Sequence, residues 1–227
     1  MNKKINYLYI ALIGIILSAC GGPEGEKAET SDAKDVKSVE GEKTNFEINT
    51  TASIVEWKGT KPTGEHVGTV NITKGKILVQ DGNIVAGKFT MDMASIVNKD
   101  LEDAEWNKKL VDHLKSPDFF NTAEFPQATF ELTEIKEYSG EALEDGSMPT
   151  HSITGNLTIK GISKSITFPA MVKMSNTQIS ATTPEFLIDR TDWDIKYQSR
   201  KFFEDLKDKF IYDEIGLKLS IQTDLKR

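Results

Sequence analysis

The chain has 227 residues, a formal net charge of −7 and a single cysteine. The acidic balance excludes a nucleic-acid binder and a protein that adheres to anionic lipid through charge, because both partners would repel it. One cysteine also excludes a disulfide within the chain, so the fold must be stabilised by its hydrophobic core. The length is enough for one domain with a sizeable core.

The N-terminus is basic and then apolar, and it ends at the only cysteine of the chain. Lys3 and Lys4 precede an apolar stretch of ten residues, which is too short to span a bilayer (about 20 residues) but suits a signal peptide. The sequence LSAC at 17–20 then resembles the lipobox of bacterial lipoproteins, which are cut before the cysteine. The alternative is an ordinary signal peptide with an incidental cysteine. We expect a signal peptide over residues 1–19 and lipidation of Cys20, whose acyl chains would attach the protein to a membrane.

The segment that follows is strongly polar. Residues 21–44 hold seven acidic residues, four lysines and only four apolar residues, all alanine or valine. Such a composition does not bury enough apolar surface to offset the entropy lost on ordering. We therefore expect a flexible acidic tether over residues 20–44 and a globular domain over residues 45–227.

From Phe46 onward, apolar and polar residues alternate with a period of two, which predicts strands with one buried and one solvated face. Breaks that contain glycine or asparagine lie at 74–75, 81–83, 155 and 160–161. The expected strands lie near residues 53–59, 66–73, 75–80, 83–93, 127–137, 151–160, 164–174, 178–190 and 211–225. An antiparallel sheet of this size must form two packed sheets or close into a barrel, and closure removes the exposed edges. We expect an all-β fold, an antiparallel β-barrel of about eight strands.

One segment departs from the strand pattern. Asp100 is placed to cap a helix over 101–115, where apolar residues recur at helical spacing, and Ser116-Pro117 ends it. Phe119 and Phe120 follow at once. We expect one helix packed at the side or mouth of the barrel and held there by these aromatic rings. Residues 139–149 are expected to form a solvated loop, and residues 198–209 a second irregular or helical excursion.

The chain lacks the patterns of common catalytic and metal sites. It has no HExxH, GxSxG, SxxK or Walker A sequence. His66, His113 and His151 are far apart, and the aspartates within 189–194 lack the spacing of a calcium loop. We therefore expect no catalytic residues, no metal site and no enzymatic activity.

Several motifs resemble those of the YceI-like family of bacterial polyisoprenoid-binding proteins. The runs DHLKSPDFFNTAEFPQATFEL (112–132) and ITGNLTIKGISKSITFPAMV (153–172) carry most of the likeness, and DRTDW (189–193) adds to it. The matching positions are His113, Leu114, Ser116, Phe119, Phe120, Phe125, Pro126, Phe130, Gly155, Leu157, Thr158, Ile159, Gly161, Ser163, Lys164 and Ile166. The resemblance extends over about 45–225. The chain departs from the family pattern in its first strands and in the acidic excursion at 198–209.

The resemblance implies a lipocalin-like barrel around an apolar tunnel that binds a long isoprenoid lipid or a quinone without catalysis. The ligand-binding candidates, which lie on the apolar stripes and just after the helix, are Phe89, Met91, Met93, Phe119, Phe130, Leu132, Leu157, Ile159, Phe168, Ala170, Val172, Leu217 and Leu219. The alternative function is that of a packed scaffold or interaction lipoprotein without a ligand. No nucleic acid is expected as a partner. The sequence leaves the oligomeric state open, and a dimer is one of the possibilities. The Cys20 anchor implies the cell envelope, facing the periplasm or the cell surface, with the outer membrane favoured.

Overall fold

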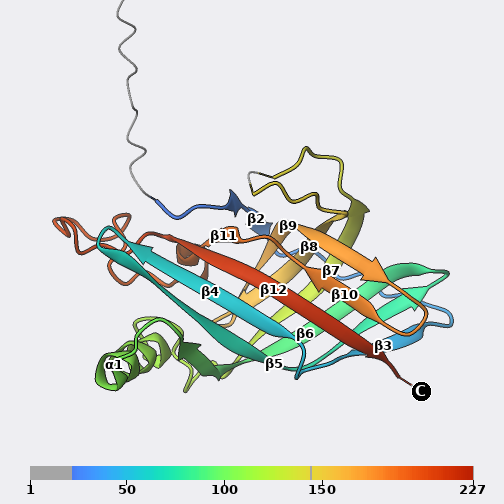
Figure 1. Ribbon diagram of the computed structural model, residues 1–227, viewed down its shortest axis with the longest axis horizontal. Coiled ribbons are helices and arrows are strands. Elements are labelled where there is room, and N and C mark those ends of the chain that lie inside the picture. The colour runs from blue at the N-terminus through green and yellow to red at the C-terminus, as the bar shows by residue number, and fades with distance from the viewer. Residues whose placement is uncertain (1–21, 144, 227) are drawn as a thin grey trace, which may run out of the picture.

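The computed structural model describes residues 22–143 and 145–226, and the expected signal peptide and Cys20 lie outside this range. The described chain forms a closed antiparallel barrel of eight strands with one α-helix, as the sequence predicts (Figure 1). Twelve strand segments make up this sheet, because some short segments share one place in the barrel wall and others add to its edges. The segments are β1 (Glu26–Lys27), β2 (Glu29–Asp32), β3 (Thr44–Ile48), β4 (Ile54–Lys61), β5 (Gly64–Gln80), β6 (Asn83–Asn98), β7 (Gln127–Glu137), β8 (His151–Ile159), β9 (Ile162–Met174), β10 (Ile179–Thr182), β11 (Phe186–Asp189) and β12 (Glu214–Leu225).

The barrel wall closes through the last strand. From β4 the hydrogen-bonded order runs through β5, β6, β7, β8, β9 and β10 to β12, and β12 pairs with β4 again. The short strands β3 and β4 share one place in the wall, because each pairs with β5 on one side and with β12 on the other. Strands β10 and β11 likewise pair with successive parts of β12.

Two of the expected strands, 66–73 and 75–80, are one continuous strand, β5. The break expected at Gly75 is wrong, because this glycine serves a close approach inside the strand. A Cβ there would lie 2.6 Å from the carbonyl oxygen of Lys88 and 2.7 Å from Cγ1 of Ile48. Gly155, also expected to mark a break, lies inside β8 for the same kind of reason. The expected strand at 178–190 is divided, with Pro184 between β10 and β11, and β3 was not predicted as a separate strand.

The N-terminal segment differs from the expected tether. Strand β2 pairs with residues 164–167 of β9, and β1 pairs in parallel with β11. Between them, the amide of Ala28 donates to the carbonyl oxygen of Leu187 at 2.8 Å, and Ala28 is only 6% exposed. The prediction of flexibility is therefore wrong for residues 26–32. The segment is held by backbone hydrogen bonds to the unpaired edges of β9 and β11, which its polar composition does not reveal.

The α-helix of the described residues, α1 (Ala104–Lys115), confirms the expected helix with a different first residue. Its N-cap is Asp103, whose carboxylate accepts from the amides of Glu105 and Trp106 at 3.0 Å each. Asp100 instead accepts from the amide of Val67 and contacts His66 Nδ1, both at 2.8 Å.

The helix lies at the end of the barrel where β6 ends (Figure 1). The buried ring of Phe119 lies 4.9 Å from the ring of His113 and 5.3 Å from that of Tyr197. The expected fixing of the helix by the aromatic residues after it is confirmed for Phe119.

A buried arginine organises the long connection from the short 3-10 helix (Arg190–Trp193) to β12. The guanidinium of Arg190 donates to the carbonyl oxygens of Ile195, Ile211 and Tyr212 at 2.8 to 3.2 Å, and it contacts Asp213 at 3.3 Å. Burial lowers the pKa of Arg190, and the neighbouring carboxylate of Asp213 opposes this. The expected excursion at 198–209 consists of turns.

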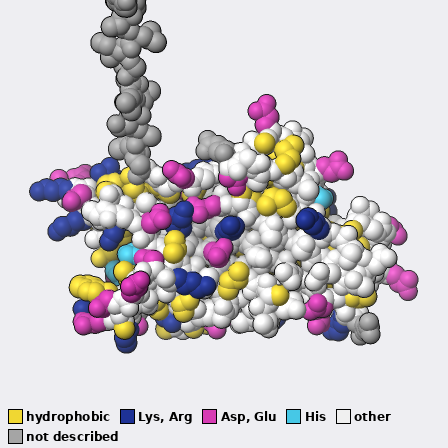
Figure 2. Space-filling model, viewed as in Figure 1, with side chains coloured by type: hydrophobic (Ala, Val, Ile, Leu, Met, Phe, Trp, Pro, Cys, Tyr) yellow, Lys and Arg dark blue, Asp and Glu magenta, His cyan; other side chains and the backbone are white. Residues whose placement is uncertain are grey.

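On the face seen in Figure 2, acidic and basic side chains lie intermixed, with small hydrophobic patches between them. Within the described residues, no helix has the length and apolar character needed to cross a bilayer.

Candidate ligand cavity

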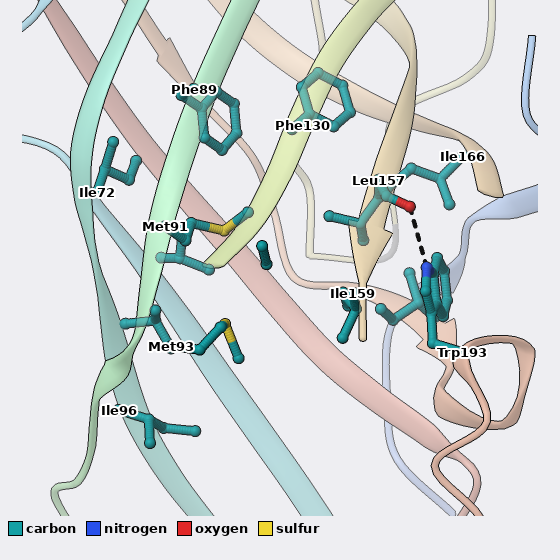
Figure 3. Close-up of a cluster of buried hydrophobic side chains, with 14 of the residues drawn as sticks. Ile72, Phe89, Met91, Met93, Ile96, Phe130, Leu157, Ile159, Ile166 and Trp193 are labelled. Carbon is teal, nitrogen blue, oxygen red and sulfur yellow. Dashed lines mark hydrogen bonds between the residues drawn. The ribbon is translucent and has the colours of Figure 1, made fainter. Parts of the chain in front are cut away.

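The interior of the barrel has two different halves. In the half next to α1, apolar side chains fill the space, as Figure 3 shows for Met91, Met93, Leu157 and their neighbours. Trp193 is fully buried there, and its indole Nε1 donates to the carbonyl oxygen of Leu157 at 3.0 Å. This half is a packed hydrophobic core.

The other half holds a cavity of about 90 Å³. Its lining is almost wholly apolar, and Lys76, Lys88 and Thr183 are the polar residues in it. The lining residues are Ile48, Lys76, Ile77, Ile84, Gly87, Lys88, Phe89, Phe130, Leu132, Ile135, Ile153, Phe168, Ala170, Val172, Ile179, Ala181, Thr183, Leu219 and Ile221. A cavity with such walls has few partners for water and is suited to an apolar group.

Three phenylalanines, on β6, β7 and β9, separate the cavity from the packed half. Phe89 and Phe130 are opposite one another on β6 and β7, and their rings stack with centroids 5.3 Å apart. The ring of Phe168 on β9 lies 5.7 Å from that of Phe130 and stacks on Phe186 at 4.5 Å. These contacts fix the floor of the cavity, since aromatic pairs add stability beyond their buried area.

A second, smaller cluster packs at the end of the barrel opposite α1. It consists of Phe46, Val79 and Ile179, with Ile84, Val172 and other partly buried residues against it. Ile84, Val172 and Ile179 also line the cavity. The cavity therefore lies between the main core and this end cluster.

The alternation of the sequence predicts which side chains face inward but not how far along the barrel they lie. Seven of the predicted ligand-binding residues line the cavity, namely Phe89, Phe130, Leu132, Phe168, Ala170, Val172 and Leu219. The other predicted residues pack in or against the main core, outside the cavity lining: Met91, Met93, Phe119, Leu157, Ile159 and Leu217. For these residues, contact with a ligand would require the packed half to open.

Several lining residues were missed by the sequence prediction. Ile153 and Ile221 stand on the same alternating stripes and could have been included. Ile48 lies on β3, where no strand was expected, whereas Ile77, Ile84 and the residues of β10 lie within expected strands but were not included among the candidates. Gly87 has no side chain, so its place in the wall follows only from the register of β6.

The cavity is small for a long ligand. An apolar cavity of about 150 Å³ accommodates benzene, and this one is smaller still. An extended chain of many carbons therefore enters only if side chains or strands move apart.

The ionisable groups of the described chain lie mainly outside the cavity. Burial opposes ionisation of Asp189, but hydrogen bonds from Lys201 and Thr191 outweigh it and hold the pKa of Asp189 below its ordinary value. Burial and the charge of Asp189 raise the pKa of Asp192. Within residues 22–143 and 145–226, no group of His, Cys, Asp or Glu side chains has the arrangement of a metal site.

Comparison with solved structures shows the same fold in two bacterial proteins. BcnA of Burkholderia cenocepacia superimposes with a TM-score of 0.58 at 21% identity, over 77% of this chain and 98% of BcnA. A protein described as a polyisoprenoid binding domain from Saccharophagus degradans, implicated in plant cell wall breakdown, gives 0.55 at 14% identity, over 80% of this chain and 98% of its own. At these identities the likeness concerns the fold alone.

Sequence comparison finds relatives over part of the chain. A UPF0312 protein of Enterobacter sp. (strain 638) is 37% identical over 103 residues, which are 45% of this chain and 46% of that protein. A UPF0312 protein of Yersinia pestis (strain Pestoides F) is 36% identical over 100 residues, 44% of this chain and 45% of its own length. The aligned part is thus about half the length of these curated relatives. The model of the YceI-like domain matches residues 46–223, which is most of the barrel, and the chain therefore belongs to the YceI-like domain family.

Proposed function

We propose that this protein binds the apolar chain of a polyisoprenoid lipid or quinone in the barrel cavity, without chemical change to the lipid. The observation that carries the proposal is the cavity between the Phe89–Phe130–Phe168 floor and the end cluster, whose walls are almost wholly apolar. The Saccharophagus neighbour, described as a polyisoprenoid binding domain, supports the choice of lipid.

The energetics favour a long chain over a short one. Burial of one CH₂ group contributes about 0.8 kcal/mol, so one five-carbon isoprene unit contributes about 4 kcal/mol when fully buried. Association costs about 4–15 kcal/mol in lost freedom. Several units must therefore leave water together, which requires the cavity to widen beyond about 90 Å³.

The membrane anchor completes the proposal. Lipidated Cys20 would hold the barrel at the cell envelope, facing the periplasm or the cell surface and with the outer membrane favoured, close to the source of its ligand. The protein would then carry or sequester the lipid. This part rests on the LSAC sequence at 17–20.

A second candidate function is that of an envelope scaffold with a filled barrel. The dense packing of the half next to α1 favours it. It differs from the first in one consequence, because a filled barrel carries no lipid when it is purified.

The deciding experiment is lipid extraction from the full-length protein, purified from membranes in mild detergent. We expect one isoprenoid class to be enriched over the total membrane extract, at close to one molecule per barrel, and native mass spectrometry to show the same mass bound. Bulk phospholipid in membrane proportions, or no lipid, would refute the carrier function and favour the scaffold.

A further inference from the structure

One part of the cavity wall lacks the strand pairing found elsewhere. Strands β6 and β7 pair only from Lys88 to Asp92 on β6 and from Gln127 to Glu131 on β7. Beyond Lys88, residues 83–87 of β6 stay paired with β5, and beyond Glu131, residues 132–137 of β7 stay paired with β8. Figure 1 shows the hairpin of β5 and β6 extending away from the upper end of β7. The wall is therefore forked at this point.

Cavity-lining side chains fill the fork. Ile84 contributes a side chain from β6, and Leu132 and Ile135 contribute theirs from β7, while Gly87 on β6 leaves backbone in the wall; all four residues are partly exposed. A Cβ on Gly87 would lie 3.5 Å from Cβ of Leu132 and 3.7 Å from its Cδ2, so the Leu132 side chain covers backbone where β6 has no side chain of its own.

A break in register explains why two β7 residues so close in sequence both reach the cavity. The pairing of β7 with β8 shifts between Leu132 and Glu134, which marks a β-bulge. The bulge takes up one residue, so Leu132 and Ile135 face inward although they are an odd number of residues apart. At the start of the fork, Lys88 and Glu131 form an exposed ion pair at 3.0 Å.

At the fork, this half of the barrel can open with the fewest broken backbone hydrogen bonds. Around the remainder of the cavity the described strands are joined by backbone pairing, with bulges in the β7–β8 and β5–β6 ladders, from β7 through β8, β9, β10 and β12 to β3, β5 and β6. Separation of any of those pairs leaves backbone donors and acceptors without partners. At the fork only side chains must move, and leucine rotamers change readily.

We propose that the fork between residues 83–87 and 132–137 is a lateral entrance to the cavity, closed by the side chain of Leu132. An apolar chain slides in sideways while its polar end remains in solvent next to the Lys88–Glu131 pair. This inference rests on the proposed function, and it assigns to that function a route and a gating residue.

A reversible disulfide across the fork tests the entrance. Gly87→Cys with Leu132→Cys places the two Cβ atoms about 3.5 Å apart, within the range of disulfides. The full chain also carries Cys20→Ser, so the new pair holds the only thiols. The control pair is Thr129→Cys with Thr158→Cys, which are opposite residues on β7 and β8 outside the fork. The probe is all-trans-retinol, a fluorescent isoprenoid alcohol, delivered from phosphatidylcholine vesicles.

We expect the reduced fork variant to load retinol, and oxidation to slow loading at least ten-fold. When the protein is loaded before oxidation, the release of retinol should be slowed to a similar extent. The control pair should load equally in both redox states, and Leu132→Ala should load faster than the parent. Equal loading rates for the oxidised and reduced fork variant would overturn the entrance while leaving the proposed function intact. No retinol binding by any variant, the parent included, would overturn both.

Discussion

The close approach at Gly155 allows a quantitative prediction about packing. This glycine lies on β8 opposite Leu132 of β7. A Cβ there would lie 2.3 Å from Cζ of Phe130 and 2.7 Å from the carbonyl oxygen of Glu131. Phe130 has little freedom to yield, because its ring is held between Phe89 and Phe168. Gly155→Ala should therefore overpack the floor of the cavity.

Overpacking of this kind costs about 1–3 kcal/mol. In a domain of 150–250 residues each kcal/mol corresponds to about 2–4 °C, so the midpoint of thermal unfolding should fall by about 2–12 °C. Urea titration followed by circular dichroism measures the same loss as a lower midpoint with an unchanged slope.

The matched control is Gly59→Ala on β4, where a Cβ would meet nothing within 4 Å. That change should leave stability unaltered or raise it by about 0.4–1 kcal/mol, because alanine restricts the unfolded chain. Equal midpoints for Gly155→Ala and Gly59→Ala would refute the reasoning about the aromatic floor.

Three further predictions concern the anchor, the N-terminal strands and acid stability. Cys20→Ser should fold but leave the detergent phase of a Triton X-114 separation, and its retention there would contradict lipid anchoring. A protein that begins at Asn45 lacks β1 and β2 and should unfold at a temperature several degrees lower than the longer chain, since the edges of β9 and β11 lose their partners; an equal melting temperature would show that the pairing adds nothing. The pKa of Asp189 is lowered in the folded state, so its contribution to stability is present above the ordinary value of about 3.9 and is lost as pH falls through the lower, folded value. Asp189→Asn should accordingly show a weaker loss of unfolding free energy on acidification below about pH 4 than the parent protein, and an equal loss would contradict the pairing with Lys201.

The sequence predicts the class of fold because alternation with a period of two is a direct record of one buried and one solvated face. The sequence-based prediction misassigns Gly75 and Gly155. A glycine that ends a strand and a glycine that makes room for a neighbouring side chain cannot be distinguished from the sequence alone. The helix cap is placed three residues early for a similar reason, because Asp100 and Asp103 are both capable N-caps. Tertiary contacts of Asp100 with His66 and Val67 decide between them.

The site is harder to predict than the fold. Alternation places Met91 and Phe89 on the same inward face, yet Phe89 lines the cavity and Met91 lies in the packed core. The difference depends on position along the barrel axis, which is set by register and by what caps each end. The polar segment 26–32 shows the same limit, because its order comes from strand edges distant in sequence.

The central claim is that the cavity, and not the packed half, receives the lipid. Substitution of two buried alanines by leucine tests it most directly. Ala170 lines the cavity and is 1% exposed, whereas Ala128 is 2% exposed and belongs to the main core. Bound isoprenoid per barrel should be measured for Ala170→Leu and Ala128→Leu, together with the urea midpoint of the same preparations.

Ala170→Leu should fill the cavity and lower the free energy of unfolding by less than about 1 kcal/mol. The amount of bound lipid per barrel should fall at least ten-fold. Ala128→Leu should lose about 1–3 kcal/mol of stability by overpacking and keep its lipid. Full lipid loading of Ala170→Leu, with loss of lipid in Ala128→Leu, would contradict the account.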